Sequence, residues 1–402
     1  MNHVFRRLTL IASTSLVLLI GCGSNLDLPA GEPPRAATTG GGEAVSAGGA
    51  TGANGDPTTG TTGACDALST RFQAVLDAAT KAQNIPGATA AVDHAGCAWR
   101  GASGVSDIPA KTATLPGDLF HIGSITKTFT ATLLLKLRAE GKVSLDSPVA
   151  DYVKGVPRGD TMTVRQLLNH TGGLFNYTEC DAFWTAVEAD PARVWKPEEL
   201  VALAAMQQPY FEPGQGWQYS NTDYIVLGMI VEAASGETAA EAMRSRILDP
   251  EKLVHTYLDG YEAAIPGLVR GYEIDGQDFL DVTWTEDPSW AWTAGGLVST
   301  TEDINKFYAD LLGGKVLAPA ELQDMTSWVD TSWPTIPEYG LGLAGRKFGS
   351  RLGTGHEGSV WGFVSASFHF TDPAAMVSVL INLENGDAAR IVGDLAKVLE
   401  AP

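Results

Sequence analysis

The segment HIGSITKTFTATLLLKL, residues 121–137, restricts the fold more than any other part of the sequence. Its leucines at 133–135 and 137 are too apolar for a solvent-facing surface, so the pattern predicts a buried helix that begins near Ser124. Lys127 nevertheless falls in the first turn of this helix, where the partial positive charge of a helix N-terminus disfavours a cation. A lysine in such a place needs a chemical explanation.

Ser124 and Lys127 are one helical turn apart, so both side chains can face the same cleft. A serine hydroxyl becomes a nucleophile at neutral pH when a base takes its proton. A neutral lysine can be that base, and lowering its pKa from about 10.4 to near 7 requires about 4–5 kcal/mol. Burial and the helix N-terminus both act in that direction. On its own, however, SxxK is a common pattern and more often a structural lysine.

A second motif is YSN, residues 219–221, which follows the turn FEPGQGW and precedes a helix. The Tyr219 hydroxyl can relay a proton to a leaving group. The Asn221 amide can bind a substrate carbonyl and also hold Lys127. The structural alternative is an asparagine that caps the helix beside a packed tyrosine.

A third motif is HEG, residues 356–358, which leads into a strand. Gly358 would let a substrate backbone approach the strand edge. The backbone N–H groups of Ser359 and Ser124 could form an oxyanion hole, worth about 3 kcal/mol for each donor. The alternative is a structural role for His356 at the start of the strand.

The distribution of predicted elements indicates a mixed α/β (α+β) domain. Strand-like segments occur at both ends, at about 87–105, 359–370 and 376–383, and helical patterns dominate the region between them. This order predicts a sheet flanked by helices and interrupted by a mostly helical insert.

The three motifs in this order resemble those of the serine β-lactamase and penicillin-binding superfamily. The resemblance covers residues 66–398 and includes TVRQLLNHTGGL, AGGLVSTTEDINKF and YGLGL. The most similar branches are the class C-like β-lactamases and the secreted D-alanyl-D-alanine carboxypeptidases. The resemblance implies a β-lactamase/transpeptidase-like antiparallel sheet, and it implies that Trp290 lines the substrate cleft.

One departure from the resemblance concerns the substrate carboxylate. The carboxypeptidase branch is expected to carry an arginine just after YGLGL, but Ala344 and Gly345 stand there. Arg346 is the nearest arginine, and His356 is the other candidate cation. Histidine in the third motif also resembles several esterases and D-amino-acid peptidases of the family.

The sequence therefore predicts a serine acyl-transfer hydrolase, with D-alanyl-D-alanine carboxypeptidase activity as the first hypothesis. Ser124 attacks, Lys127 is the base, Tyr219 protonates the leaving amine and Asn221 orients the substrate. A class C-like β-lactamase or an esterase is the alternative within the family, and a penicillin-binding sensor without turnover is the alternative outside enzymes. The expected substrate is a peptide or a β-lactam, and no metal or cofactor is implied. The net charge of −20 predicts no nucleic-acid partner and no polybasic membrane patch, and we expect a monomer.

The N-terminal segment predicts export and anchoring. Residues 1–21 resemble a lipoprotein signal peptide that ends in LLIGC, so Cys22 would be lipidated and hold the protein to the periplasmic side of the cell envelope. Gly23 after the cysteine goes with sorting to the outer membrane. Residues 22–64 are rich in Gly and Thr and predict a disordered tether, followed by a hydrolase domain at 65–402. The alternative is an ordinary signal peptide with an incidental cysteine.

Three further cysteines stand at 65, 97 and 180. An exported protein can form disulfides. If the helix predicted at 66–82 packs antiparallel to the strand that follows it, its start lies near the turn before Cys97. This predicts a Cys65–Cys97 bond and leaves Cys180 as a free thiol.

Overall fold

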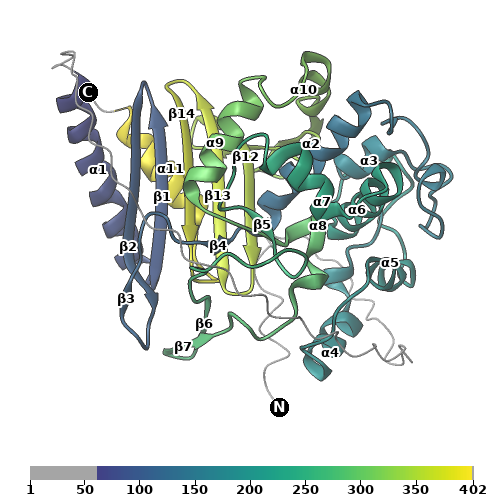
Figure 1. Ribbon diagram of the computed structural model, residues 1–402, viewed down its shortest axis with the longest axis horizontal. Coiled ribbons are helices and arrows are strands. Elements are labelled where there is room, and N and C mark those ends of the chain that lie inside the picture. Colours follow the sequence, from purple (N-terminus) through teal and green to yellow (C-terminus); the bar gives the residue numbers. More distant parts are fainter. Residues whose placement is uncertain (1–60, 401–402) are drawn as a thin grey trace, which may run out of the picture.

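A computed structural model describes residues 61–400, with the side chains of 61 and 62 left aside. The predicted signal peptide, Cys22 and the tether up to residue 60 lie outside the described residues. The predicted antiparallel sheet with helices on its faces and a helical insert is confirmed (Figure 1). Among the described residues, none of the helices is both long and apolar enough to cross a bilayer.

The main sheet has nine antiparallel strands in the order β3-β2-β1-β14-β13-β12-β11-β10-β9. Its strands are β1 (Gly87–His94), β2 (Cys97–Asp107), β3 (Thr112–Ala113), β9 (Val329–Asp330), β10 (Glu338–Tyr339), β11 (Ala344–Phe348), β12 (Arg351–Val360), β13 (Phe363–Thr371) and β14 (Ala374–Ile381). Strand β1 pairs with β14 from Ala88↔Ile381 to His94↔Ala375. The two ends of the domain therefore meet in the middle of one sheet.

Two small sheets accompany the main one. One contains β4 (Phe120–His121), β8 (Leu297–Ser299) and β5 (Tyr257–Leu258), and the other is a hairpin of β6 (Tyr272–Asp275) and β7 (Asp278–Asp281). Strand β4 pairs with β8 directly before the Ser124 turn. This pairing fixes the point from which the turn leaves.

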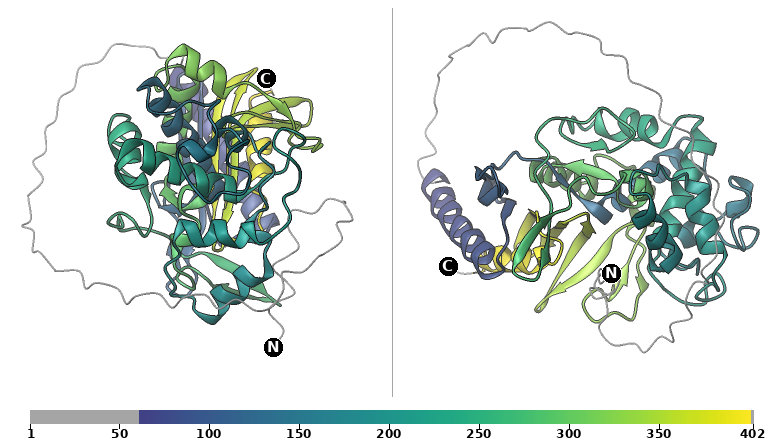
Figure 2. Two further views of the ribbon diagram at one scale, coloured as in Figure 1. Left: turned by 90° about the vertical axis from the view of Figure 1, so that its right-hand side faces the viewer. Right: turned by 90° about the horizontal axis from the view of Figure 1, so that it is seen from below.

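The helices divide into two groups (Figures 1 and 2). Helices α1 (Thr61–Ala82) and α11 (Ala388–Val398) pack on each other and on one face of the sheet, and α9 (Thr301–Leu312) packs against β1, β13 and β14. The insert beyond α9 contains α2 (Thr126–Ala139), α3 (Val164–Leu168), α4 (Asp181–Ala189), α5 (Pro197–Ala205), α6 (Asn221–Ser235), α7 (Ala239–Met243), α8 (Trp292–Gly295) and α10 (Pro319–Met325).

Each face of the sheet has its own apolar core. Under α1 and α11, the core is built on Phe72, Leu76, Phe368, Val377 and Ile391, all at most 1% exposed. The opposite core includes α2, whose leucines at 133–135 and 137 are fully buried as predicted. Burial on both faces explains why β1 has six consecutive buried residues instead of an alternating pattern.

Some predicted element boundaries are wrong. Helix α1 begins at Thr61 instead of 66, and the helix predicted from Ser124 opens with a separate 3₁₀ turn, η1 (Gly123–Ile125). The strand-like run at 359–370 breaks at Trp361 and Gly362, whose φ angles of +46° and +79° make the two-residue hairpin turn between β12 and β13. Helix α9 is capped by Thr300, whose side chain accepts from the backbone N–H of Asp303.

The disulfide prediction is half correct. Cys65 and Cys97 are bonded, with Cα atoms 5.4 Å apart, and α1 packs on β2 as expected. Cys180 is not a free thiol, because it is disulfide-bonded as well. The expectation of a free thiol followed from setting Cys22 aside as a lipidated residue.

Candidate active site

Ser124 lies in the 3₁₀ turn η1, wedged between α2 and the end of β12. A Cβ atom on Gly358 would lie 2.1 Å from the Ile122 oxygen and 2.7 Å from the Ser124 nitrogen. A Cβ on Gly123, where φ is +50°, would lie 2.6 Å from the Ser359 nitrogen. The two glycines therefore allow the serine turn to touch the strand, and they bring the backbone nitrogens of Ser124 and Ser359 into one place.

This contact revises the role predicted for Gly358. The sequence predicted that Gly358 lets a substrate backbone approach the strand edge. In the structure, the backbone that lies close to Gly358 is the turn that carries Ser124. Gly123 was not singled out from the sequence, although its position next to the SxxK serine was the available signal. Ser365 adds a further link, because its hydroxyl donates to the Ile122 oxygen over 2.7 Å.

Lys127 is fully buried at the start of α2, and its Nζ atom has three oxygen neighbours. Nζ lies 2.7 Å from Asn221 Oδ1, 2.7 Å from the Ala294 carbonyl oxygen and 3.0 Å from Ser124 Oγ. All three oxygens belong to uncharged groups. A neutral amine has two N–H bonds and one lone pair, so it can donate to the two carbonyl oxygens and direct its lone pair at the serine hydroxyl.

The surroundings of Lys127 favour that neutral amine. Burial lowers the pKa of Lys127 well below its usual value, while the charge of Asp223 acts in the opposite direction. Burial is the larger effect because the side chain has no solvent exposure. Ser124 thus has a base within hydrogen-bonding distance, which is the arrangement that nucleophilic catalysis requires.

Tyr219 faces the same two residues. Its ring centroid is 4.8 Å from Lys127 Nζ. Burial raises the pKa of the Tyr219 hydroxyl above its usual range, although a hydrogen bond with Ser124 lowers it. The hydroxyl is therefore protonated at neutral pH and can donate a proton to a leaving group beside Ser124.

Asn221 is the first residue of α6, and its own contacts fix its orientation. Its Nδ2 group donates to Thr178 Oγ1 over 3.1 Å, so Oδ1 is the atom turned toward Lys127. Its backbone N–H donates to Asn176 Oδ1 over 3.1 Å. Asn176 and Thr178 follow the HTGGL segment and were missed from the sequence, as was Ala294, which acts only through its backbone oxygen.

His356 does not present a positive charge. Burial and the nearby Lys127 lower its pKa to about 3. Its Nδ1 lies 2.5 Å from the Glu357 carbonyl oxygen, which can only accept, so Nδ1 carries the proton. Nε2 then accepts from the Tyr339 hydroxyl over 2.9 Å. The prediction that His356 could be the cation for a substrate carboxylate is not supported by this geometry.

Arg346 lies on the other face of the sheet. It pairs with Gly353 in the register of β11 and β12, and side chains alternate between faces along β12, so Arg346 and His356 point in opposite directions. Its guanidinium forms an ion pair of 2.6 Å with Glu357. The expectation that Arg346 reaches the substrate cleft is therefore corrected.

Trp290 belongs to a group of aromatic side chains near the end of β12. Its ring centroid is 5.0 Å from that of Trp361, 5.6 Å from that of Trp184 and 5.7 Å from that of Phe183. Its backbone oxygen accepts from the Tyr177 hydroxyl, one residue before Thr178. Trp290 thus lies beside Trp361, which follows β12, and beside the segment that carries Thr178. That Trp290 lines the substrate cleft stays a prediction.

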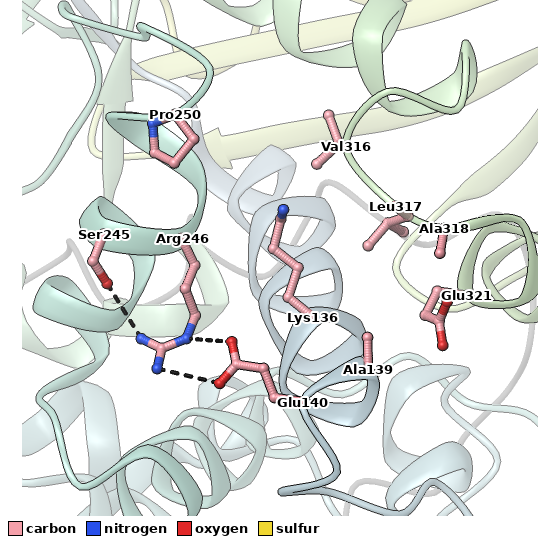
Figure 3. A pocket seen from close by; sticks show the side chains of 10 residues that line it. All are labelled: Lys136, Ala139, Glu140, Ser245, Arg246, Pro250, Val316, Leu317, Ala318 and Glu321. Atoms are coloured by element: carbon pink, nitrogen blue, oxygen red, sulfur yellow. Dashed lines mark hydrogen bonds and ion pairs between the residues drawn. The ribbon is translucent and has the colours of Figure 1, made fainter.

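A separate hollow of about 330 Å³ lies at the C-terminal end of α2 (Figure 3). Its lining includes Lys136, Glu140, Arg246 and Glu321, and the close-up shows Arg246 bonded to Glu140. None of the three motifs contributes to its lining, so we do not connect it with the chemistry at Ser124. Within residues 61–400, no cluster of three or more His, Cys, Asp or Glu side chains is arranged to hold a metal ion.

A buried lysine that faces a serine, with a tyrosine and an asparagine beside it on this sheet-and-insert scaffold, defines a serine acyl-transfer hydrolase. The sequence profile of the Beta-lactamase family matches residues 72–400, and the chain belongs to this family.

Two solved structures resemble this chain over most of its length. A D-stereospecific amidohydrolase from Streptomyces sp. is 35% identical, with a TM-score of 0.73 over 80% of this chain and 97% of that protein. The D-amino acid amidase from Ochrobactrum anthropi SV3, complexed with L-phenylalanine amide, is 28% identical, with a TM-score of 0.77 over 83% and 99%. The putative penicillin-binding protein PbpX of Bacillus subtilis (strain 168) is 28% identical over 56% of this chain, which spans about half of that relative (53%).

Proposed function

We propose that this protein hydrolyses amides and short peptides of D-amino acids through an acyl-enzyme on Ser124. Lys127 takes the serine proton, and the N–H groups of Ser124 and Ser359 bind the oxyanion. Tyr219 then protonates the leaving nitrogen, which departs as an amine or ammonia, and the proton held by Lys127 returns to Tyr219. Water completes the cycle by attacking the acyl-enzyme.

We base the choice of substrate on the positions of the two candidate cations, His356 and Arg346. A carboxypeptidase must bind a terminal carboxylate, but His356 is neutral and Arg346 is bonded to Glu357 on the other face of the sheet. A primary amide or an internal peptide bond makes no such demand. The similarity to a D-stereospecific amidohydrolase and a D-amino acid amidase supports the same choice.

The aromatic group around Trp290 supports a bulky acyl side chain. Trp184 and Trp290 are partly exposed and pack edge-on against each other, and Trp290 also packs against the buried Trp361, two residues after Ser359. Aromatic rings prefer offset or edge-to-face neighbours and gain about 0.5–1.5 kcal/mol from them. We therefore expect D-phenylalanine amide to be cleaved faster than D-alanine amide.

The deciding experiment compares three substrates of the full-length protein in detergent. These are D-phenylalanine amide, D-Ala-D-Ala with a free carboxylate, and D-Ala-D-Ala with a C-terminal amide, each with Ser124→Ala protein as control. We expect the two D-Ala-D-Ala forms to be cleaved within about threefold of each other. A charge-assisted hydrogen bond contributes about 1.5–3 kcal/mol, so a tenfold or greater preference for the free acid would overturn the proposal.

D-alanyl-D-alanine carboxypeptidase activity remains the second candidate, favoured by the similarity to a putative penicillin-binding protein. A preference for D-Ala-D-Ala with a free carboxylate over its C-terminal amide would favour this activity. Rapid, repeated turnover of nitrocefin would instead favour a β-lactamase, and fast cleavage of a p-nitrophenyl ester without amide cleavage would favour an esterase. A single acylation without turnover of any substrate would favour a penicillin-binding sensor.

We also propose that the protein is a monomer exported and held at the cell envelope by lipid on Cys22, as the LLIGC segment predicts. The Cys22 sulfur can carry either lipid or a disulfide, so the labelling experiment also decides whether Cys22 is available to bond Cys180. Radiolabelled palmitate supplied to expressing cells should enter the wild-type protein and not a Cys22→Ala variant. Equal labelling of both would overturn the anchor. A molecular mass in solution that corresponds to a single chain of the detergent-free Cys22→Ala variant would support the monomer.

A further inference from the structure

A buried histidine and a buried aspartate lie directly behind the active site, and the reaction scheme above uses neither. His170 follows α3 and Asp223 lies in the first turn of α6. His170 Nδ1 and Asp223 Oδ2 are 2.8 Å apart, and the two side chains are 0% and 1% exposed. His170 also has a φ angle of +61°, which is uncommon for a residue other than glycine.

The neighbouring atoms indicate where the proton of this pair lies. The backbone N–H of Ser220 can only donate, and it lies 3.3 Å from His170 Nδ1, so Nδ1 carries its lone pair and not a hydrogen. The Asp223 carboxyl group then supplies the hydrogen of the shorter 2.8 Å contact, and the two donors share the single lone pair of Nδ1. In this assignment both side chains are uncharged.

The alternative, an ion pair, is unfavourable at this site. In the described part of the chain, Asp223 Oδ1 and His170 Nε2 have no hydrogen-bond partner. An ionised carboxylate would therefore have one buried oxygen without a donor. The N-terminus of α6 favours a carboxylate, but this effect is smaller than the desolvation cost of a buried, incompletely paired ion. Burial likewise raises the pKa of Asp223 and lowers that of His170.

The pair touches the catalytic residues from behind. The centroid of the His170 ring is 4.5 Å from that of Tyr219, whose ring in turn lies 4.8 Å from Lys127 Nζ. Asp223 is two residues after Asn221 and is the acidic group whose charge acts on Lys127. An ionised Asp223 would raise the pKa of Lys127 and so reduce the fraction of the neutral amine that can act as a base.

We propose that His170 and Asp223 form an uncharged, one-proton pair that positions Tyr219 and keeps a negative charge away from Lys127. They are positioning residues, since neither is adjacent to the reacting atoms. The pair concerns formation of the acyl-enzyme, whichever substrate supplies the acyl group, so it does not depend on the proposed D-amino-acid specificity. The ionisable groups that surround it are Lys127 of α2, Tyr210, Tyr219 and Tyr224 on the side of the insert, and Tyr339 and His356 on the side of the sheet.

The first test uses Asp223→Asn, which keeps an N–H donor for His170 Nδ1 and removes the acid. Acylation of Ser124 by a fluorescent penicillin is followed from pH 5 to pH 10. We expect the rate to fall severalfold, because the amide holds the ring of His170 less firmly. The apparent pKa of the rising limb of the rate–pH profile should stay within about 0.3 pH of that of the parent protein. An uncharged carboxyl group has no charge that acts on Lys127, so its removal should leave the pKa of Lys127 unchanged. A downward movement of one pH unit or more would show that Asp223 is ionised and would overturn the proposal.

A second test does not require activity. The infrared difference spectrum between the parent protein and Asp223→Asn, recorded in H₂O and D₂O near neutral pH, should contain the C=O stretching band of a protonated carboxyl group. Loss of the symmetric and antisymmetric carboxylate bands instead would overturn the proposal. His170→Asn serves as the matched variant for the ring, because asparagine tolerates a positive φ. It should lower the acylation rate about tenfold through Tyr219; an unchanged rate would remove the positioning role of His170.

Discussion

Lys127 of α2 donates to the side-chain oxygen of Asn221 of α6 over 2.7 Å, and this hydrogen bond joins the SxxK motif to the YSN motif. The two residues are 94 positions apart in the sequence. Because Thr178 holds the other end of the asparagine amide, the Asn221 oxygen has one orientation available. Lys127 is therefore held in place by α6 as well as by its own helix, α2.

The rate of acylation should rise with pH through an apparent pKa well below the usual value of lysine. Burial lowers the pKa of Lys127, and only the neutral amine accepts the serine proton, so the rate increases as pH rises through that pKa. Lys127→Arg should lose at least about 10²-fold in acylation rate, because arginine does not deprotonate. Stopped-flow labelling by a fluorescent penicillin gives both results. An arginine variant that retains more than a tenth of the rate would contradict the role.

Ser124 should be the only residue that a fluorescent penicillin labels covalently. Its Oγ lies 3.0 Å from Lys127 Nζ, and the close contact of its turn with β12 brings the backbone nitrogens of Ser124 and Ser359 together. Peptide mapping of the labelled protein should place the adduct on Ser124, and Ser124→Ala should abolish it. Labelling that survives in the alanine variant would rule out the assignment.

The sequence predicted those parts of the site that depend on local spacing. Ser124 and Lys127 are one turn apart, and YSN and HEG are compact, so each motif could be recognised without knowing the fold. The sheet was predictable for a similar reason, since the strand-like segments gather at the two ends of the domain. The resemblance to a known family then supplied the order in which the motifs come together.

What the sequence could not predict depends on register or on backbone atoms. Arg346 was a reasonable candidate by distance along the chain, but strand alternation turns it to the opposite face from His356. The Ala294 oxygen binds Lys127 through a group that every residue carries, so no residue type marks it. The contact of His170 with Asp223 joins α6 to the end of α3 and needs the folded insert.

Gly358→Ala should displace the serine turn. The added Cβ would meet the Ile122 oxygen at 2.1 Å and the Ser124 nitrogen at 2.7 Å, and both are backbone atoms that cannot move independently. Because one oxyanion donor is worth about 10²–10³ in rate, we expect a loss of that size in acylation. Gly117→Ala is the matched control, since a Cβ there meets nothing within 4 Å. Equal activity of the two variants would disprove the close contact.

The Cys65–Cys97 disulfide should contribute to stability and not to catalysis. It closes a loop with a sequence separation of 32 residues, for which the chain-entropy estimate is about 3–4 kcal/mol. The bond joins the start of α1 to β2, on the face of the sheet away from the insert. We expect Cys65→Ser/Cys97→Ser to unfold at lower denaturant concentration while acylation stays within about twofold. A large loss of acylation in the folded variant would be inconsistent with this separation.

The Arg346–Glu357 ion pair should stabilise the fold in a pH-dependent way without affecting substrate choice. Burial raises the folded-state pKa of Glu357 above its usual value, and Arg346 partly offsets this. A group with a raised folded pKa loses stabilisation as pH rises through that pKa, because the unfolded state gives up its proton first. Arg346→Ala raises the folded pKa further, so its destabilisation should be larger at pH 7 than at pH 4.5. The side chains are 20% and 30% exposed, which limits the effect to about 1 kcal/mol.

Thermal unfolding of Arg346→Ala at the two pH values measures this difference. Adding Glu357→Gln should recover most of the loss at pH 7 and flatten the pH dependence, because the unpaired acid is then gone. Cleavage of D-Ala-D-Ala with a free carboxylate should stay within about twofold of the parent protein in Arg346→Ala. If Arg346 instead bound the substrate carboxylate, that activity would fall tenfold or more while amide cleavage stayed constant. A loss of cleavage of the free acid alone would show that Arg346 binds the substrate carboxylate, and it would favour the carboxypeptidase hypothesis.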